Sequence, residues 1–146
     1  MIKHAQISDV KIAAELALLL WPDNVLEDFI LNMKSCITGE NSVIFLAIDA
    51  DQAIGFAQCQ LRTDYVEGTD SSPVGYLEGL FVLDNYRQQG IARTLVEACE
   101  KWALTKGCTE FASDCELDNT DSLKMHLKLG FTEANRIICF TKKLKE

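Results

Sequence analysis

The residues with the clearest potential for chemistry lie at a turn between an apolar strand and a long helix. Residues 77–83 predict a strand, and the polar turn after it leads through Arg87 and Gly90 into an amphipathic helix. A helix start carries backbone N–H groups without intrahelical partners and the positive end of the helix dipole, so it attracts anions. Gly90 and the small Ala92 let a ligand approach the backbone closely. The segment predicts a phosphate site, but an ordinary strand-turn-helix connection fits the pattern alone equally well.

A carboxylate, Glu78, lies within the same apolar strand. Burying a charged side chain is costly unless the charge is paired or functional, and a carboxylate in such a place suits a general base. Gly79, inside the strand, indicates a β-bulge or a close backbone approach. The alternative interpretation is a glutamate that faces outward from an edge strand.

The polar, turn-rich stretch 63–75 predicts a loop before this strand. It carries Asp64, Glu67 and Asp70 around Tyr65 and contains no basic residue. Loops bear a large share of binding residues. Two interpretations stay open, a loop that binds a cationic ligand and a solvated acidic loop.

Two further side chains are predicted at the ends of elements. Pro22 disfavours helix at the residue before it, so Trp21 is expected where a helix stops. Helical periodicity alone favours a core tryptophan over one that faces a cleft. Asp114 lies near the end of a predicted strand, 111–115, and strand ends in open α/β sheets commonly host ligands.

Composition narrows the classes of partner. The chain has 146 residues with 48% apolar side chains, which favours a single folded domain over residues 1–146. The formal net charge is −8, a field that repels nucleic acid and anionic membrane and attracts cationic ligands. Taken by itself, the charge favours the simpler interpretation that it only keeps the protein soluble. Because the overall field is negative, an anionic ligand would need the local positive potential of a helix N-terminus.

Cysteine spacing and hydropathy indicate the compartment. Six cysteines occur, and none forms a Cys-x-x-Cys pair, which disfavours a zinc or redox motif. The N-terminus lacks the apolar core of a signal peptide, and no apolar run approaches the length of a membrane span. We expect a cytoplasmic protein with reduced thiols.

Periodicity and turn signals predict strands that form an antiparallel meander, with helices on its faces. The expected helices cover approximately 8–21, 23–39, 90–106 and 119–130, and the expected strands 1–7, 43–48, 53–62, 77–83, 111–115 and 137–141.

Two motifs follow each other along the second half of the chain. Residues 87–92 read Arg-x-x-Gly-x-Ala, and residues 119–122, Asn-Thr-Asp-Ser, are followed by His126 and Leu129-Gly130-Phe131. They resemble the two signature motifs of the GNAT superfamily of acetyl-CoA-dependent N-acetyltransferases. A narrower resemblance, to the aminoglycoside 6′-N-acetyltransferases, rests on Leu20-Trp21-Pro22, residues 64–73, Leu77-Glu78-Gly79 and Ala112-Ser113-Asp114.

The resemblance implies an α/β (α+β) fold. Its central sheet would be mixed and mostly antiparallel, with six to seven strands and about four flanking helices. A β-bulge near Gly79 and Leu80 would splay two strands and leave backbone N–H groups facing a thioester.

The resemblance also implies acetyl-CoA as co-substrate, with no metal. The cofactor-binding residues would be Leu80, Phe81 and Val82 for pantetheine, Gln88, Gln89, Gly90, Ile91, Ala92 and Arg93 for the pyrophosphate, and Asn119 for a further bond. The acceptor-binding residues would be Trp21, Tyr65, Glu78, Asp114 and, as a weaker match, Asn135.

For catalysis, Glu78 is the expected base that takes a proton from the attacking amine. A backbone N–H near Leu80 would stabilise the oxyanion. Many relatives place a tyrosine acid five residues before the Gly-Phe pair, and the nearest position here is His126. A histidine can donate a proton near neutral pH, but one on the helix surface is an equal alternative.

The leading hypothesis is an aminoglycoside 6′-N-acetyltransferase that transfers acetyl directly within a ternary complex. The alternatives are a related enzyme that acetylates a polyamine, a small metabolite amine or a protein amine, and a non-catalytic acetyl-CoA-binding module. We expect a homodimer with a cationic small-molecule acceptor and no nucleic-acid or membrane partner.

Overall fold

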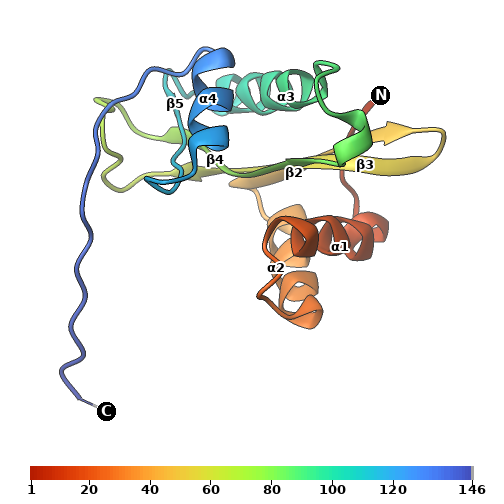
Figure 1. The fold of residues 1–146 in the computed structure, drawn as a ribbon, viewed down its shortest axis with the longest axis horizontal. Coiled ribbons are helices and arrows are strands. Elements are labelled where there is room, and N and C mark those ends of the chain that lie inside the picture. The colour runs from red at the N-terminus through yellow and green to blue at the C-terminus, as the bar shows by residue number, and fades with distance from the viewer. Residues whose placement is uncertain (146) are drawn as a thin grey trace. The chain divides into compact units, whose positions relative to one another are not determined.

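The computed structural model describes residues 1–145 and is shown in Figure 1. The chain divides into two compact units, Met1–Asp114 and Cys115–Glu146. No helix within residues 1–145 is long and apolar enough to cross a membrane.

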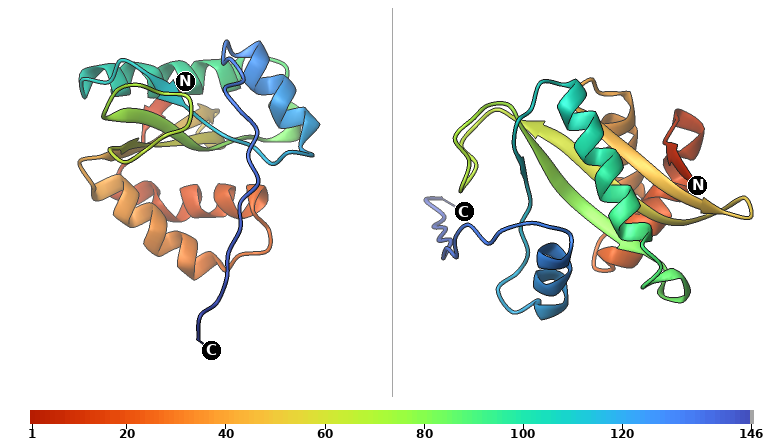
Figure 2. Two further views of the ribbon diagram at one scale, coloured as in Figure 1. Left: turned by 90° about the vertical axis from the view of Figure 1, so that its left-hand side faces the viewer. Right: turned by 90° about the horizontal axis from the view of Figure 1, so that it is seen from above.

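The first unit is a five-stranded sheet in the order β1-β2-β3-β4-β5. The first three strand pairs are antiparallel, and β4 pairs with β5 in parallel. Figures 1 and 2 show α1 and α2 on one face of the sheet and α3 on the other. The elements of this unit are β1 Ile2–His4, η1 Ile7–Asp9, α1 Val10–Leu20, α2 Leu26–Thr38, β2 Ser42–Asp49, β3 Gln52–Arg62, β4 Val74–Val82, η2 Asp84–Tyr86, α3 Ile91–Thr105 and β5 Phe111–Ala112.

The predicted helices and strands of this unit form because their apolar residues meet in the core. Met33 from α2 and Ile44, Leu46 and Phe56 from the sheet are fully buried in one cluster. On the other face, α3 buries Leu95, Val96, Cys99 and Ala103. The mixed, mostly antiparallel architecture predicted from the sequence is confirmed.

The predicted β-bulge is present in β4, at Glu78. Gln58 of β3 pairs with Gly79 and the next residue, Cys59, pairs with Leu77, so Glu78 is the extra residue. The bulge therefore lies one residue before the predicted pair, Gly79 and Leu80. A bulge leaves its extra residue out of the ladder and turns its side chain away from the regular alternation.

The sheet opens between β4 and β5. The parallel pairing covers only Gly75 with Phe111 and Tyr76 with Ala112. Residues 77–82 of β4 continue past the end of β5, and no strand among the described residues pairs with them on that side. This is the splay that the sequence predicted.

One predicted strand is shorter than expected, and another does not form. The strand predicted at 111–115 is only Phe111–Ala112, and the strand predicted at 137–141 is absent, so the sheet has five strands instead of six or seven. A run of apolar residues such as 137–140 gives a strand propensity, but a strand forms only where the backbone finds a neighbour. Across the described residues 131–145 the chain adopts neither helix nor strand.

The second unit contains one helix, α4 Thr120–Lys128, within its described residues. Asn119 is its N-cap, and its side-chain oxygen accepts a hydrogen bond from the Ser122 N–H at 3.1 Å. Such a cap satisfies one of the unpaired N–H groups of the helix start. The predicted start of the last helix is confirmed.

Candidate active site

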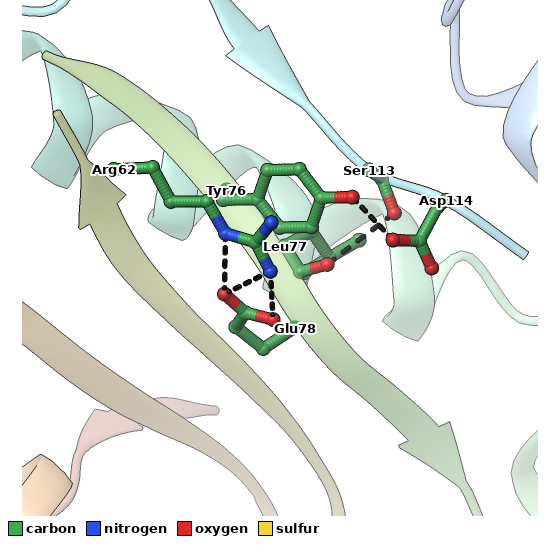
Figure 3. A network of polar contacts seen from close by, with 6 residues as sticks. All are labelled: Arg62, Tyr76, Leu77, Glu78, Ser113 and Asp114. Carbon is green, nitrogen blue, oxygen red and sulfur yellow. Dashed lines mark hydrogen bonds and ion pairs between the residues drawn. The ribbon is translucent and has the colours of Figure 1, made fainter. Parts of the chain in front are cut away.

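Glu78 forms a two-pronged ion pair with Arg62, the last residue of β3 (Figure 3). Arg62 Nη2 lies 2.9 Å from Glu78 Oε1, and Arg62 Nε lies 3.1 Å from Oε2. The side chains are 37% and 20% exposed. The carboxylate is thus paired within the sheet, the first of the two situations considered from the sequence, and is not an outward-facing edge glutamate.

Arg62 also contacts Tyr76, and Tyr76 contacts Asp114. The guanidinium carbon of Arg62 lies 3.5 Å from the centroid of the Tyr76 ring, a cation–π geometry. The Tyr76 hydroxyl donates a hydrogen bond to the Asp114 carboxylate (Figure 3). Burial and this carboxylate raise the pKa of Tyr76, so the phenol stays protonated and keeps donating. Asp114, predicted at a strand end, is thereby held beside the Glu78 pair.

A hollow of about 500 Å³ opens on the face of the sheet that carries α2. Its ionisable lining residues are Asp28 and Glu78, and both are acidic. The rest of the lining is aromatic or carries side-chain amides, namely Trp21, Asn24, Phe29, Asn32, Gln58 and Gln60. The wall has no cation of its own, so it suits a cationic, hydrogen-bonding ligand.

Trp21 serves both as core and as cleft wall, so the two alternatives are not exclusive. It caps the C-terminus of α1, and its ring packs 5.8 Å from Phe29 and 6.3 Å from Phe56, centroid to centroid. A Cβ at Gly79 would lie 2.6 Å from Trp21 Cη2, so only glycine admits the indole there. The same tryptophan lines the hollow.

The loop before β4 is held by Glu110 and does not place its tyrosine in this hollow. Glu110 accepts hydrogen bonds from the backbone N–H groups of Asp70 and Ser71, both at 2.9 Å. Tyr65 is 81% exposed and donates to Glu67, whose carboxylate raises the pKa of the tyrosine. The acceptor role assigned to Tyr65 stays a prediction.

The turn before α3 has the geometry of a phosphate-binding turn. Gly90 is the N-cap with φ of +81°, a conformation that favours glycine, and no side chain caps the helix. A Cβ at Gly90 would meet no atom within 4 Å, so the space above the backbone is open. The first-turn residues Ile91, Ala92 and Arg93 begin a 15-residue helix, whose N–H groups and dipole suit an anion. The residues present therefore fit a pyrophosphate group.

Arg87, the first residue of the Arg-x-x-Gly-x-Ala motif, connects this turn to the end of β4. Its Nε donates to the Val82 carbonyl at 2.8 Å, and its Nη1 lies 3.1 Å from the Asp84 carboxylate. The Val82 carbonyl is thus already bonded within the chain. The proposed pantetheine contacts of Leu80, Phe81 and Val82 stay predictions, on a stretch of β4 that no strand of residues 1–145 covers on its β5 side.

The remaining predicted residues lie in the second unit. The Nδ1–H of His126 donates to the Ser122 carbonyl at 2.7 Å, and its ring packs edge-on to Phe131 with centroids 5.2 Å apart. Asn135 accepts a bond from the Arg136 N–H at 2.8 Å. The cofactor role of Asn119, the acid role of His126 and the acceptor role of Asn135 stay predictions.

Arg62 and Tyr76 are the candidate functional residues that the sequence reasoning missed. Arg62 ends the predicted strand 53–62, and Tyr76 directly precedes the predicted strand 77–83. An antiparallel pairing of these strands brings the two residues together, so the pattern held a usable signal.

Among residues 1–145, no group of three or more His, Cys, Asp or Glu side chains is arranged to hold a metal ion.

Comparison with known proteins finds a family and relatives that match most of the chain. A sequence profile of the Acetyltransferase (GNAT) family matches residues 11–131. An aminoglycoside N(6′)-acetyltransferase type 1 of Acinetobacter baumannii is 46% identical over 142 residues, 94% of this chain and 96% of the relative. The enzyme of the same name from Salmonella typhimurium is 42% identical over 124 residues, 85% of this chain and 86% of the relative.

A solved structure agrees over almost the whole chain. It is AAC(6′)-Iy in complex with the bisubstrate analog CoA-S-monomethyl-acetylneamine, with a TM-score of 0.94 and 38% identity. The match covers 98% of this chain and 97% of that chain.

The anchoring of the acidic loop should depend on pH through Glu110. Hydrogen bonds from Ser71 and the Asp70 backbone lower the pKa of Glu110 below its ordinary value of 4.5. The lowered pKa means that the anchor is complete above pH 4.5 and is lost as the pH falls through the folded-state value. NMR titration of the Asp70 and Ser71 amides should show a coupled transition below pH 4.5.

Glu110→Gln is the control, because the amide cannot ionise and should abolish that transition. An amide transition with its midpoint at or above 4.5 in the unmodified protein would contradict the anchoring role.

Proposed function

The chain belongs to the GNAT acetyltransferase family, and we propose that it is an aminoglycoside 6′-N-acetyltransferase that uses acetyl-CoA. The observation that carries the proposal is an acidic, aromatic hollow with Glu78 in its wall, in a chain similar to such enzymes over most of its length. Aminoglycosides carry several ammonium groups and many hydroxyl groups. The carboxylates and side-chain amides of the hollow complement both.

The chain must bind a cation and an anion despite its net charge of −8. Asp28 gives the hollow a negative charge that attracts the acceptor, whereas the charge of Glu78 is balanced by Arg62. The N-terminus of α3, with Gly90 as its cap, offers the local positive potential that an anionic cofactor needs. The turn Gln88–Arg93 would hold the pyrophosphate of acetyl-CoA, and Leu80–Val82 would pair with its pantetheine arm.

Glu78 is the base in this proposal. An ammonium must lose a proton before its nitrogen can attack, and a carboxylate takes that proton directly or through water. When bound, acetyl-CoA supplies the thioester whose acetyl group is transferred. The opened edge of β4 near Leu80 offers backbone N–H groups for the oxyanion. Asp114 binds a second positive group of the acceptor.

His126 is the proposed acid for the departing thiolate. Because its Nδ1–H donates to the Ser122 carbonyl, donation to the thiolate requires a second proton on Nε2. His126 lies in the last turn of α4.

We further propose that the whole chain works as one acetyltransferase domain in the cytoplasm, and that it is a homodimer. The family match from residue 11 to 131 spans both units and supports the single domain. Acetyl-CoA is a metabolite of the cytoplasm. The dimer is supported by Ile138 and Phe140, which are 80% and 87% exposed and which a second copy could cover.

Release of CoA with a panel of amines tests the substrate. We expect rapid thiol release from acetyl-CoA with kanamycin and tobramycin, acetylation at the 6′-amine by mass spectrometry and NMR, and little release with spermidine or a peptide amine. The acidic hollow also fits a polyamine, so turnover of spermidine alone would replace the aminoglycoside proposal. Binding of acetyl-CoA without release for any amine would favour a non-catalytic module.

Removing the proposed base should reduce the rate of chemistry. Glu78→Gln is expected to lower kcat about 10²–10⁴-fold, the usual contribution of general acid–base catalysis. Asp114→Ala should raise the KM for kanamycin roughly 10-fold, because it removes a charged hydrogen-bonding partner. Glu97→Gln, an equal charge change at an exposed position of α3, is the control. Unchanged kinetics in Glu78→Gln and Asp114→Ala would remove their assigned roles.

The homodimer predicts a mass of twice the chain by light scattering at micromolar concentration. Introducing a charge at an exposed apolar position, as in Phe140→Asp, should shift the mass toward the monomer because the charge would be buried in the interface. Leu104→Asp, at an exposed position of α3, serves as the control. A monomer mass for the unmodified protein would reject the dimer.

A further inference from the structure

Arg62 contacts both the proposed base, Glu78, and the ring of Tyr76 (Figure 3). It reaches Glu78 through three N–O contacts of 2.9–3.1 Å. Its guanidinium carbon lies 3.5 Å from the Tyr76 ring centroid, and Tyr76 in turn donates to Asp114. The guanidinium therefore connects Glu78 to Tyr76, and the hydroxyl of Tyr76 in turn holds Asp114.

We propose that Arg62 is a positioning residue for the acceptor amine, holding Glu78 directly and Asp114 through Tyr76. The proposal rests on the function proposed above and adds a residue to it. No chemical step passes through Arg62 itself. It would act by fixing where the two carboxylates stand when the amine arrives.

The bulge at Glu78 makes such a holder necessary. An unpaired bulge residue is not fixed by the ladder, and its carboxylate ends a flexible side chain of three rotatable bonds. A guanidinium binds a carboxylate through a planar fork, which fixes both the direction and the rotation of the carboxyl plane. The ring of Tyr76 supports one face of the guanidinium, while the carboxylate binds its edge.

Glu78 keeps the capacity to bind an amine while it is held. A carboxylate has about four lone-pair sites. Arg62 makes one contact to Oε1 and two to Oε2. The carboxylate lines the hollow, whereas Arg62 is not part of the hollow's lining. The amine and the guanidinium would therefore approach Glu78 from different directions.

The charges give this role a kinetic signature. Arg62 cancels the charge of Glu78, so Arg62, Glu78 and Asp114 together present one net negative charge to the acceptor. Loss of Arg62 makes the site more negative, which should preserve or strengthen binding of a polycation. The base, however, would no longer be fixed, so kcat should fall while the KM for kanamycin stays unchanged or decreases. General damage to the site would instead raise KM.

The test compares Arg62→Met, Arg62→Lys and Lys3→Met with the unmodified enzyme, using CoA release with kanamycin. Arg62→Met should lower kcat about 10–100-fold, because a misplaced catalytic group loses rates of this order. Arg62→Lys keeps the charge without the fork and should recover only part of the rate. Lys3→Met removes the cation of another partly exposed ion pair, Lys3 with Asp9, and should change kcat less than 2-fold.

A double-mutant cycle separates action through Glu78 from an independent effect. In the Glu78→Gln background, Arg62→Met should lower kcat by less than about 3-fold, since the group that it positions is gone. Tyr76→Phe keeps the ring and removes the bond to Asp114, so it should raise the KM for kanamycin more than it lowers kcat. Circular dichroism and acetyl-CoA affinity confirm folding, and Arg62→Lys carries the test if Arg62→Met does not fold.

Equal losses from Arg62→Met in both backgrounds would overturn the proposal, as would a raised KM with unchanged kcat or an effect no larger than that of Lys3→Met. These outcomes differ from failure of the proposed function, in which the unmodified enzyme does not turn over kanamycin. If it turns over spermidine instead, the same variants are measured with spermidine. No turnover of any amine would reject both proposals.

Discussion

The half-buried ion pair between Arg62 and Glu78 is the interaction on which the proposed acceptor site depends. A carboxylate in an apolar strand must be paired, exposed or protonated, because burial of an unpaired charge is costly. The bulge in β4 takes Glu78 out of the regular ladder, and Arg62 at the end of β3 provides the partner. A charged group can thus stand inside an otherwise apolar strand and still reach the hollow.

In the proposed function the same strand would contact both substrates, and its two edges have different surroundings. Toward β3, residues 74–82 are paired except at the bulge residue Glu78, which fixes the strand firmly. Toward β5 the pairing stops at Tyr76, and the open edge leads to the turn that Arg87 fastens and Gly90 ends. An anionic cofactor and a cationic acceptor can therefore meet at one strand without sharing a charged surface.

Local signals in the sequence predicted much of this arrangement. Periodicity and Gly90 predicted the apolar strand, the turn and the helix between residues 77 and 106. Pro22 predicted that the first helix ends at Trp21. The pairing of Arg62 with Glu78 depends on strand register and on an extra residue across a 16-residue separation, which no local pattern specifies. The strand expected at 137–141 failed for a related reason, since its propensity does not supply a pairing neighbour.

Pairing the proposed base with a cation raises an objection, because Arg62 occupies part of the carboxylate that would accept the proton. The magnitudes decide against that objection. Arg62 and Glu78 are 37% and 20% exposed, and partly exposed ion pairs contribute only about 0–1 kcal/mol. Correct orientation of reacting groups can supply about 7–11 kcal/mol of a barrier, so even partial misplacement costs more than the ion pair itself contributes. A carboxylate freed by the bulge gains more from being held than it loses from being paired.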